Sequence, residues 1–133
     1  VETVMETAIE RFTVLSYLVI GLSHILQPRA WVQFFLNLRE KGEAGIFVVA
    51  FLHLPLGLLI VSFHNVWTGI PAVVTVLGWA NVLKGTLYFL FPAIGMKTIG
   101  RVRMERAHEF VIAGAVLVVV LSALVAYDMI TAI

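Results

Sequence analysis

The chain predicts an all-α integral membrane protein, in which four transmembrane helices form one bundle and a single domain over residues 1–133. Hydrophobic residues make up 61% of the sequence, charged residues 13%, and the mean hydropathy is +1.02. Soluble domains average about 45–50% apolar and about 25% charged residues. Four apolar stretches each approach the roughly 20 residues that cross a bilayer core, so little chain is left for a soluble catalytic domain.

The first predicted span runs from about Ala8 to Gln27. We expect it to be a retained helix and not a signal peptide, because it is long and an acidic segment precedes it. Pro28 and Arg29 end it. Apolar and polar residues are then interspersed over residues 31–39, which predicts a short amphipathic helix lying in the membrane interface.

Three further spans are predicted, at about residues 44–63, 71–92 and 107–128. Pro55 is expected to bend the second span, because its ring removes one backbone hydrogen bond. Residues 64–70 form a tight turn before the third span. None of the stretches alternates with a period of two, so each is helical.

Basic residues set the predicted orientation. Seven of the nine lie in two connecting segments, 28–43 and 93–106: Arg29, Arg39, Lys41, Lys97, Arg101, Arg103 and Arg106. The positive-inside bias places both loops in the cytoplasm and both termini outside.

A faint internal repeat relates the two halves of the chain. Gly21 and Gly85 each stand seven residues before a helix-ending proline, Pro28 or Pro92, and the same offset aligns the starts of the second and fourth spans. The pattern is compatible with two parallel helical hairpins related by an approximate two-fold axis along the membrane normal. In transporters such repeats hold the site at their interface. So few matched residues can also arise by chance, and the sequence leaves both readings open.

Polar residues within the spans predict a cytoplasm-facing pocket. Asn81, Lys84 and Tyr88 share one helix face by their spacing. The depth of each residue along its span predicts a floor of His53, Asn81 and Lys84 and a rim of His24, Tyr88 and Glu109. These six are the candidate residues for binding a ligand or handling protons.

Each candidate also has a structural interpretation that the sequence leaves open. Lys84 can extend its stem to the headgroups instead of meeting an internal partner. His53 can donate to a carbonyl freed by Pro55 instead of binding a ligand. His24 and His108 lie close enough to the interface to be solvated.

Several functions are not expected. The absence of cysteine removes disulfides, thiolate metal sites and iron–sulfur clusters. The sequence has no H-E-x-x-H, G-x-S-x-G or phosphate-loop motif, and no pair of buried carboxylates, so hydrolase and kinase readings have no support. His24 and His53 are misaligned in depth for a haem. We expect no catalytic residues, metal or cofactor, and a net charge of +1 gives no reason to expect nucleic acid.

A family resemblance lies in residues 58–67, 74–79 and 83–92, which include the turn His-Asn-Val-Trp and the helix segment Leu-Lys-Gly through Phe-Pro. These segments resemble a group of small bacterial inner-membrane proteins. The resemblance implies a four-helix bundle in a bacterial cytoplasmic membrane and brings no activity with it. The segment from Gly21 to Pro28 is more loosely similar to DoxX-like proteins, some of which are linked to quinone-coupled redox work.

Two functions remain. The first is a non-enzymatic accessory subunit or homo-oligomeric component, whose contacts would use small residues: Gly57, Gly78, Gly85, Gly114, Ala80, Ala113, Ala115 and Ala123. The alternative is a channel, carrier or quinone- or lipid-binding protein with its site around Lys84, Asn81 and His53. Membrane lipids, including anionic ones drawn by the basic loops, are the expected partners. The sequence favours the first by a small margin.

Overall fold

The computed structural model describes residues 2–131, which form six α-helices and one 3₁₀ turn. The elements in chain order are α1 (Glu2–Leu26), α2 (Pro28–Glu40), α3 (Glu43–Phe63), α4 (Ala72–Leu90), α5 (Pro92–Ile99), η1 (Met104–Arg106) and α6 (His108–Thr131). Helices α1, α3, α4 and α6 are each long and apolar enough to cross a membrane. The four predicted long helices and the short helix after the first are therefore confirmed.

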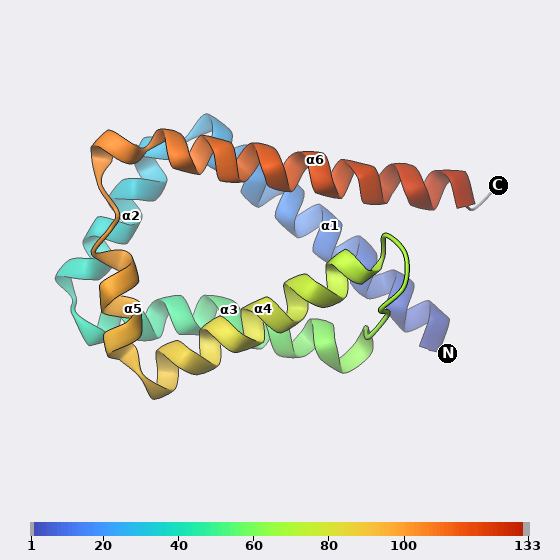
Figure 1. Ribbon diagram of the computed structural model, residues 1–133, viewed down its shortest axis with the longest axis horizontal. Coiled ribbons are helices and arrows are strands. Elements are labelled where there is room, and N and C mark those ends of the chain that lie inside the picture. The colour runs from blue at the N-terminus through green and yellow to red at the C-terminus, as the bar shows by residue number, and fades with distance from the viewer. Residues whose placement is uncertain (1, 132–133) are drawn as a thin grey trace.

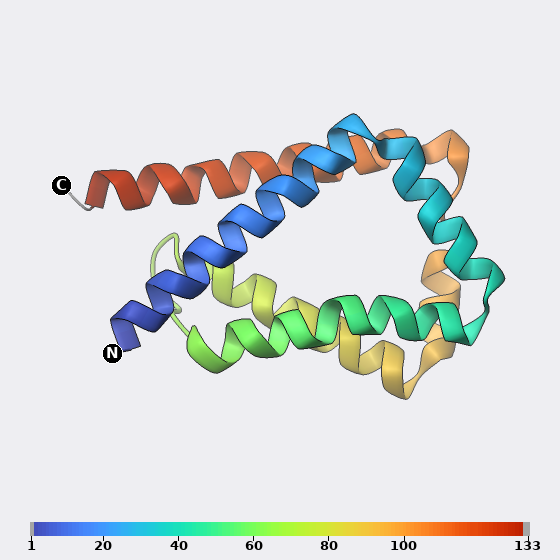
Figure 2. The same cartoon turned by 180° about the vertical axis from the view of Figure 1, so that it is seen from behind.

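The long helices form two pairs. Helix α3 packs along α4, and α1 packs along α6, and these are the most extensive contacts between elements. Figure 1 shows the short helices α2 and α5 together at one end, with the start of α1, the end of α6 and the α3–α4 turn at the other. The view from behind shows the same arrangement (Figure 2). The pairs converge at the end with the α3–α4 turn and diverge toward α2 and α5.

Glycines allow the backbones within each pair to approach closely. A Cβ atom on Gly85 would lie 2.5 Å from the Cβ of Leu54 on α3, and one on Gly114 would lie 2.4 Å from the carbonyl oxygen of Gly21 on α1. The glycines that the sequence suggested for contacts between molecules, Gly57, Gly78, Gly85 and Gly114, therefore lie inside the two pairs. Close intramolecular packing accounts for them.

Two apolar clusters hold the pairs in place. The first joins all four long helices near the end with the α3–α4 turn, through Ile9, Val14, Ile60, Val74, Leu121 and Leu124. The second lies at the opposite end and joins α2, α3, α4 and α5, through Leu38, Ile46, Val49, Ala50, Tyr88 and Ile99. Neither α1 nor α6 contributes a buried residue to the second cluster. The space between the pairs is therefore closed at one end only.

Two predicted boundaries are wrong. Helix α1 begins at Glu2 and not near Ala8, because glutamates at a helix N-terminus favour the helix through its dipole. The segment 93–106 is not a loop, since it contains most of α5 and all of η1. Pro92 occupies the first turn of α5, where its fixed φ suits a helix and its missing N–H is not needed.

The elements follow the same order twice. A long helix, a short helix that begins at a proline and a second long helix make up α1–α2–α3, and the same order recurs in α4–α5–α6. The pairing matches this order as well, because the first helix of each set packs against the last helix of the other.

We expect Gly85→Ala to destabilise the α3–α4 pair. The added methyl group would meet the Cβ of Leu54 at 2.5 Å and its backbone nitrogen at 2.7 Å. Overpacking of this kind costs roughly 1–3 kcal/mol. The measurement is the midpoint of SDS-induced unfolding in mixed micelles, followed by circular dichroism.

Gly100→Ala is the matched control for that change. At the end of α5, a Cβ atom on Gly100 would meet only carbonyl oxygens of its own helix, the nearest at 3.2 Å. The midpoint of this variant should stay near that of the wild type. Equal shifts in the two variants would contradict the proposed role of close α3–α4 packing.

Candidate functional site

A cavity of about 720 Å³ lies between the two helix pairs, on the side of α2 and α5. Its size falls within the roughly 300–1,000 Å³ of small-molecule sites. Its lining includes all six candidate residues: His24, His53, Asn81, Lys84, Tyr88 and Glu109. They come from α1, α3, α4 and α6, so the fold gathers side chains that are far apart in the sequence.

The hydrogen bond between Asn81 and Tyr17 spans the two pairs at the cavity. The amide nitrogen of Asn81 donates to the Tyr17 hydroxyl at 2.6 Å and to the carbonyl oxygen of Leu77 at 2.8 Å. Asn81 is 7% exposed, so this link between α4 and α1 is shielded from solvent. Tyr17 was not among the predicted residues, although it lies four residues before Gly21 on the face of α1 that meets other helices.

Lys84 lines the cavity and faces an aromatic ring. Its Nζ lies 5.7 Å from the centroid of the Tyr88 ring, within reach of a cation–π interaction. Among the side chains that the structure describes, the ion pairs are His64 with Glu10 and Arg106 with Glu109, so none of these carboxylates neutralises Lys84. A cation is therefore presented to the cavity without an anionic partner from the described part of the chain.

His53 and His24 bond to their own helices in the same way. The Nδ1 of His53 lies 2.7 Å from the carbonyl oxygen of Val49, and the Nδ1 of His24 lies 2.7 Å from that of Ile20. A carbonyl oxygen only accepts, so each Nδ1 carries the hydrogen and each Nε2 is an acceptor in the neutral ring. Pro55 frees a different carbonyl, four residues before it, so the predicted bond from His53 to that carbonyl is wrong.

An aromatic stack forms one wall of the cavity. The His24 ring stacks on Trp31 with centroids 4.1 Å apart and on Phe110 at 5.6 Å, and Phe35 lies 5.9 Å from Phe110. The indole N–H of Trp31 donates to the Ser23 hydroxyl at 2.9 Å, which fixes α2 against α1. His24 is thus partly buried among rings and is not a freely solvated side chain.

The mouth of the cavity is basic. Arg101, Arg103 and Arg106 line it together with one carboxylate, Glu109. Glu109 binds Arg106, with N–O distances of 2.7 Å, and does not bind Lys84. Four cationic side chains and one carboxylate therefore face the same cavity. Such a field attracts an anionic group and holds it more strongly where water is scarce.

The sequence missed a second polar cluster at the other end of the molecule. The sequence placed His64 in a tight turn and did not single out Glu10, but the structure buries both and brings them together. Glu10 and Tyr17 are seven residues apart and so share one face of α1. This spacing was the feature of the sequence that could have identified both as inward-facing polar residues. Among the described residues, no group of three or more His, Asp or Glu is placed to hold a metal ion.

No family model, curated protein or solved structure matches the chain. The resemblance to small bacterial inner-membrane proteins and to DoxX-like proteins thus stays a prediction.

The cavity predicts different chemical access to two alanines on α6. The chain has no cysteine, so introduced thiols give a clean signal. Ala113 lines the cavity, whereas Ala115 is exposed on another face of the helix. In lipid nanodiscs, Ala113→Cys should react with a charged thiol reagent much faster than Ala115→Cys, because an open cavity would admit water and a helix face against lipid would exclude charge. Equal reaction rates, followed by mass spectrometry, would contradict an open cavity.

Proposed function

We propose that this chain is an integral membrane protein that binds an amphipathic ligand with an anionic head group between its two helix pairs. The observation that carries the proposal is Lys84, a cation without a carboxylate partner among the described residues, placed in a largely apolar cavity with a basic mouth. The cavity favours the binding or carrier alternative over a purely structural component, which has no need of one.

Membrane insertion is supported by the surface of the long helices. Large apolar side chains are exposed on all four, as with Leu15, Phe51, Leu83 and Val119, which are 61–68% exposed. Soluble monomers rarely expose large contiguous apolar patches. In lipid the same surface is favourable, and the helices satisfy their own backbone hydrogen bonds.

The basic end is proposed to face the cytoplasm. The connecting segments with most of the arginine and lysine residues lie at the end with α2 and α5, and the positive-inside bias places such segments in the cytoplasm. In a bacterial inner membrane the two termini would then lie outside. The mouth of the cavity would open at the level of the anionic headgroups of the inner leaflet.

The shape and charge of the cavity indicate the class of ligand. Lys84 and the arginines at the mouth suit a carboxylate or phosphate group. Ile20, Val49 and Leu117 offer apolar contact for a hydrocarbon chain or ring. A neutral quinone would use the apolar walls and leave the excess positive charge uncompensated, so an anionic amphiphile fits better.

The predicted internal repeat places this site at the interface of the two halves. Tyr17 and Asn81, which are hydrogen-bonded to each other, are 64 positions apart. The same spacing relates further pairs of lining residues: Ile20 with Lys84, His24 with Tyr88, Trp31 with Gly95, Phe35 with Ile99, Ile46 with Phe110, Val49 with Ala113 and His53 with Leu117. An approximate two-fold axis through the cavity is the arrangement found in carriers built from repeats.

Assembly with other copies or with a larger membrane complex stays a prediction. The small residues that motivated it support it less than the sequence suggested, because the glycines make close contacts within the chain. The alanines proposed for such contacts, Ala80, Ala113, Ala115 and Ala123, are exposed, although Ala113 also lines the cavity.

The test is binding of a brominated fatty acid, whose bromine quenches tryptophan emission. In a Trp67→Phe, Trp79→Phe background, Trp31 in the cavity wall is the remaining tryptophan. We expect saturable quenching in nanodiscs of zwitterionic lipid, and at least about tenfold weaker binding in Lys84→Met. Loss of a hydrogen bond to a charged group costs about 1.5–3 kcal/mol, and about 1.4 kcal/mol corresponds to tenfold.

Lys97→Met is the matched control, since Lys97 is exposed on α5 and does not line the cavity. It should bind the fatty acid like the wild type. The brominated methyl ester, which lacks the charge, should bind weakly to all variants. Equal saturable quenching in the wild type and Lys84→Met would contradict the proposed anion site. Tight binding of the ester would favour a neutral ligand such as a quinone.

A further inference from the structure

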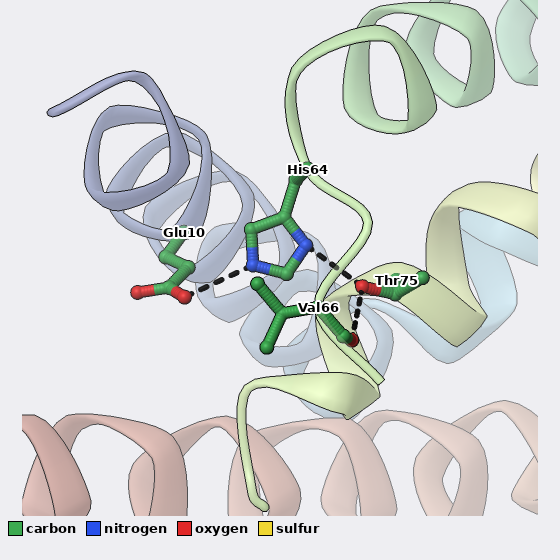
Figure 3. Close-up of polar contacts among 4 residues, drawn as sticks. All are labelled: Glu10, His64, Val66 and Thr75. Carbon is green, nitrogen blue, oxygen red and sulfur yellow. Dashed lines mark hydrogen bonds and ion pairs between the residues drawn. The ribbon is translucent and has the colours of Figure 1, made fainter. Parts of the chain in front are cut away.

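A buried polar network lies at the end of the molecule opposite the cavity mouth. His64, the residue that follows α3, is 0% exposed, and its Nε2 lies 2.9 Å from Oε1 of Glu10 on α1. Its Nδ1 lies 2.8 Å from the hydroxyl oxygen of Thr75 on α4. That hydroxyl in turn donates to the carbonyl oxygen of Val66 at 2.7 Å (Figure 3).

These three contacts require three protons. The Val66 carbonyl can only accept, so the Thr75 hydroxyl proton lies between those two oxygens. The hydroxyl oxygen must then accept from Nδ1 of His64, which uses the single N–H of a neutral imidazole. The contact between Nε2 and Glu10 needs a further proton, since an ionised carboxylate and an unprotonated ring nitrogen are both acceptors.

The extra proton gives the pair one of two forms. Either an imidazolium donates to an ionised Glu10, or a protonated Glu10 donates to a neutral His64. Both forms carry no net charge. Removing this proton leaves two protons for three contacts, and one of the contacts must then break, whichever way the imidazole and the hydroxyl rearrange.

We propose that Glu10, His64 and Thr75 form a proton-binding site that fastens α1, the α3–α4 turn and α4 together, so that loss of one proton loosens this end of the molecule. The proposal goes beyond ligand binding and does not depend on what the cavity holds.

The network joins the two helix pairs, so loss of its proton would weaken the contact between them. Two polar side-chain contacts described by the structure join the helix pairs, Glu10 on α1 with His64 after α3 and Tyr17 on α1 with Asn81 on α4. All other side-chain hydrogen bonds described for the long helices stay within a pair or involve the connecting segments. Breaking the first contact leaves the second, together with the apolar cluster that Tyr17 packs against, to hold the pairs together.

Other ionisable groups at this end do not complete the network. Helix α1 contributes Glu6 and Arg11, and α6 contributes Tyr127 and Asp128. No hydrogen bond or ion pair described for residues 2–131 joins any of them to Glu10 or His64. Between residues 54 and 83, α3, α4 and their turn contain no titratable side chain other than His64.

The direction of the pH effect follows from the proton count. Raising the pH removes the shared proton and breaks a contact. Lowering the pH adds a second proton, which gives an imidazolium facing a carboxylic acid, and the carbonyl oxygen of that acid still accepts a hydrogen bond. The network therefore keeps its three contacts at low pH and loses one of them at high pH.

The experiment measures the distance between spin labels at Ala8→Cys on α1 and Thr68→Cys on the α3–α4 turn, by pulsed electron–electron double resonance in lipid nanodiscs. Both residues are exposed, and the chain has no native cysteine. The doubly labelled wild type should show one short, narrow distance at low pH. A longer or broader population should grow as the pH rises, because each way of breaking the network removes one of the contacts that hold the turn to α1 or to α4.

Two substitutions should abolish this pH dependence by different routes. In Glu10→Gln, the amide donates to Nε2 of neutral His64, so all three contacts form without an added proton. In Thr75→Val, Nδ1 loses its acceptor, so a neutral ring can place its proton on Nε2 and donate to ionised Glu10. Neither variant should therefore respond to pH: Glu10→Gln should keep the short distance, and Thr75→Val, whose turn has lost both contacts to α4, should show one unchanging distance distribution over the whole pH range. Asp128→Asn, the control for a nearby carboxylate, should follow the wild type.

A wild-type distance that does not change with pH, while circular dichroism shows an intact helical fold, would overturn the proposal. A pH response that is the same in the wild type, Glu10→Gln and Thr75→Val would also overturn it, by placing the titrating group elsewhere. Should Glu10→Gln fail to give a helical, monodisperse protein, Thr75→Val decides alone, because it changes the proton count and leaves the carboxylate in place.

Discussion

Close backbone contact within each helix pair is the constraint on which the rest of the structure depends. Gly57, Gly78 and Gly85 let α3 and α4 approach until a single added methyl group would clash, and Gly21 with Gly114 do the same for α1 and α6. Each pair is therefore a tight unit of its own. Two such units, joined by short helices at one end and by an apolar cluster at the other, enclose a space that neither pair fills.

Polar groups inside this frame follow the rule that a buried polar atom needs a partner. Asn81 meets Tyr17, and His64 meets both Glu10 and Thr75. The Thr13 hydroxyl is buried without a partner, and Lys84 is the charged exception, since an aromatic ring beside it does not neutralise its charge. An uncompensated ammonium group in an apolar environment is costly, so either water or an anion must occupy the cavity beside it. This requirement connects the fold to the proposed ligand class.

Hydropathy predicted the long helices because the apolar composition of each span is a local property of the chain. It could not predict which helix packs on which, since α1 pairs with α6 through contacts far apart in sequence. The six candidate residues were found because polar groups within apolar helices are conspicuous. Glu10 was missed because a carboxylate near a helix terminus looks solvated until its partner is known. The partner, His64, lies in a turn whose path depends on the whole α3–α4 pair.

The two polar sites occupy opposite ends of one frame, and the Tyr17–Asn81 bond lies on the inner side of the first apolar cluster, between them. Under the proposed repeat, these two residues are equivalent positions in the two halves, so their bond must lie on the axis that relates them. Rotation of one pair against the other about that bond would widen one end as it narrows the other. A proton at Glu10 and His64 and an anion beside Lys84 would then act on the same motion from opposite ends. Binding at either site would bias the other, because linkage between two sites on one equilibrium is reciprocal.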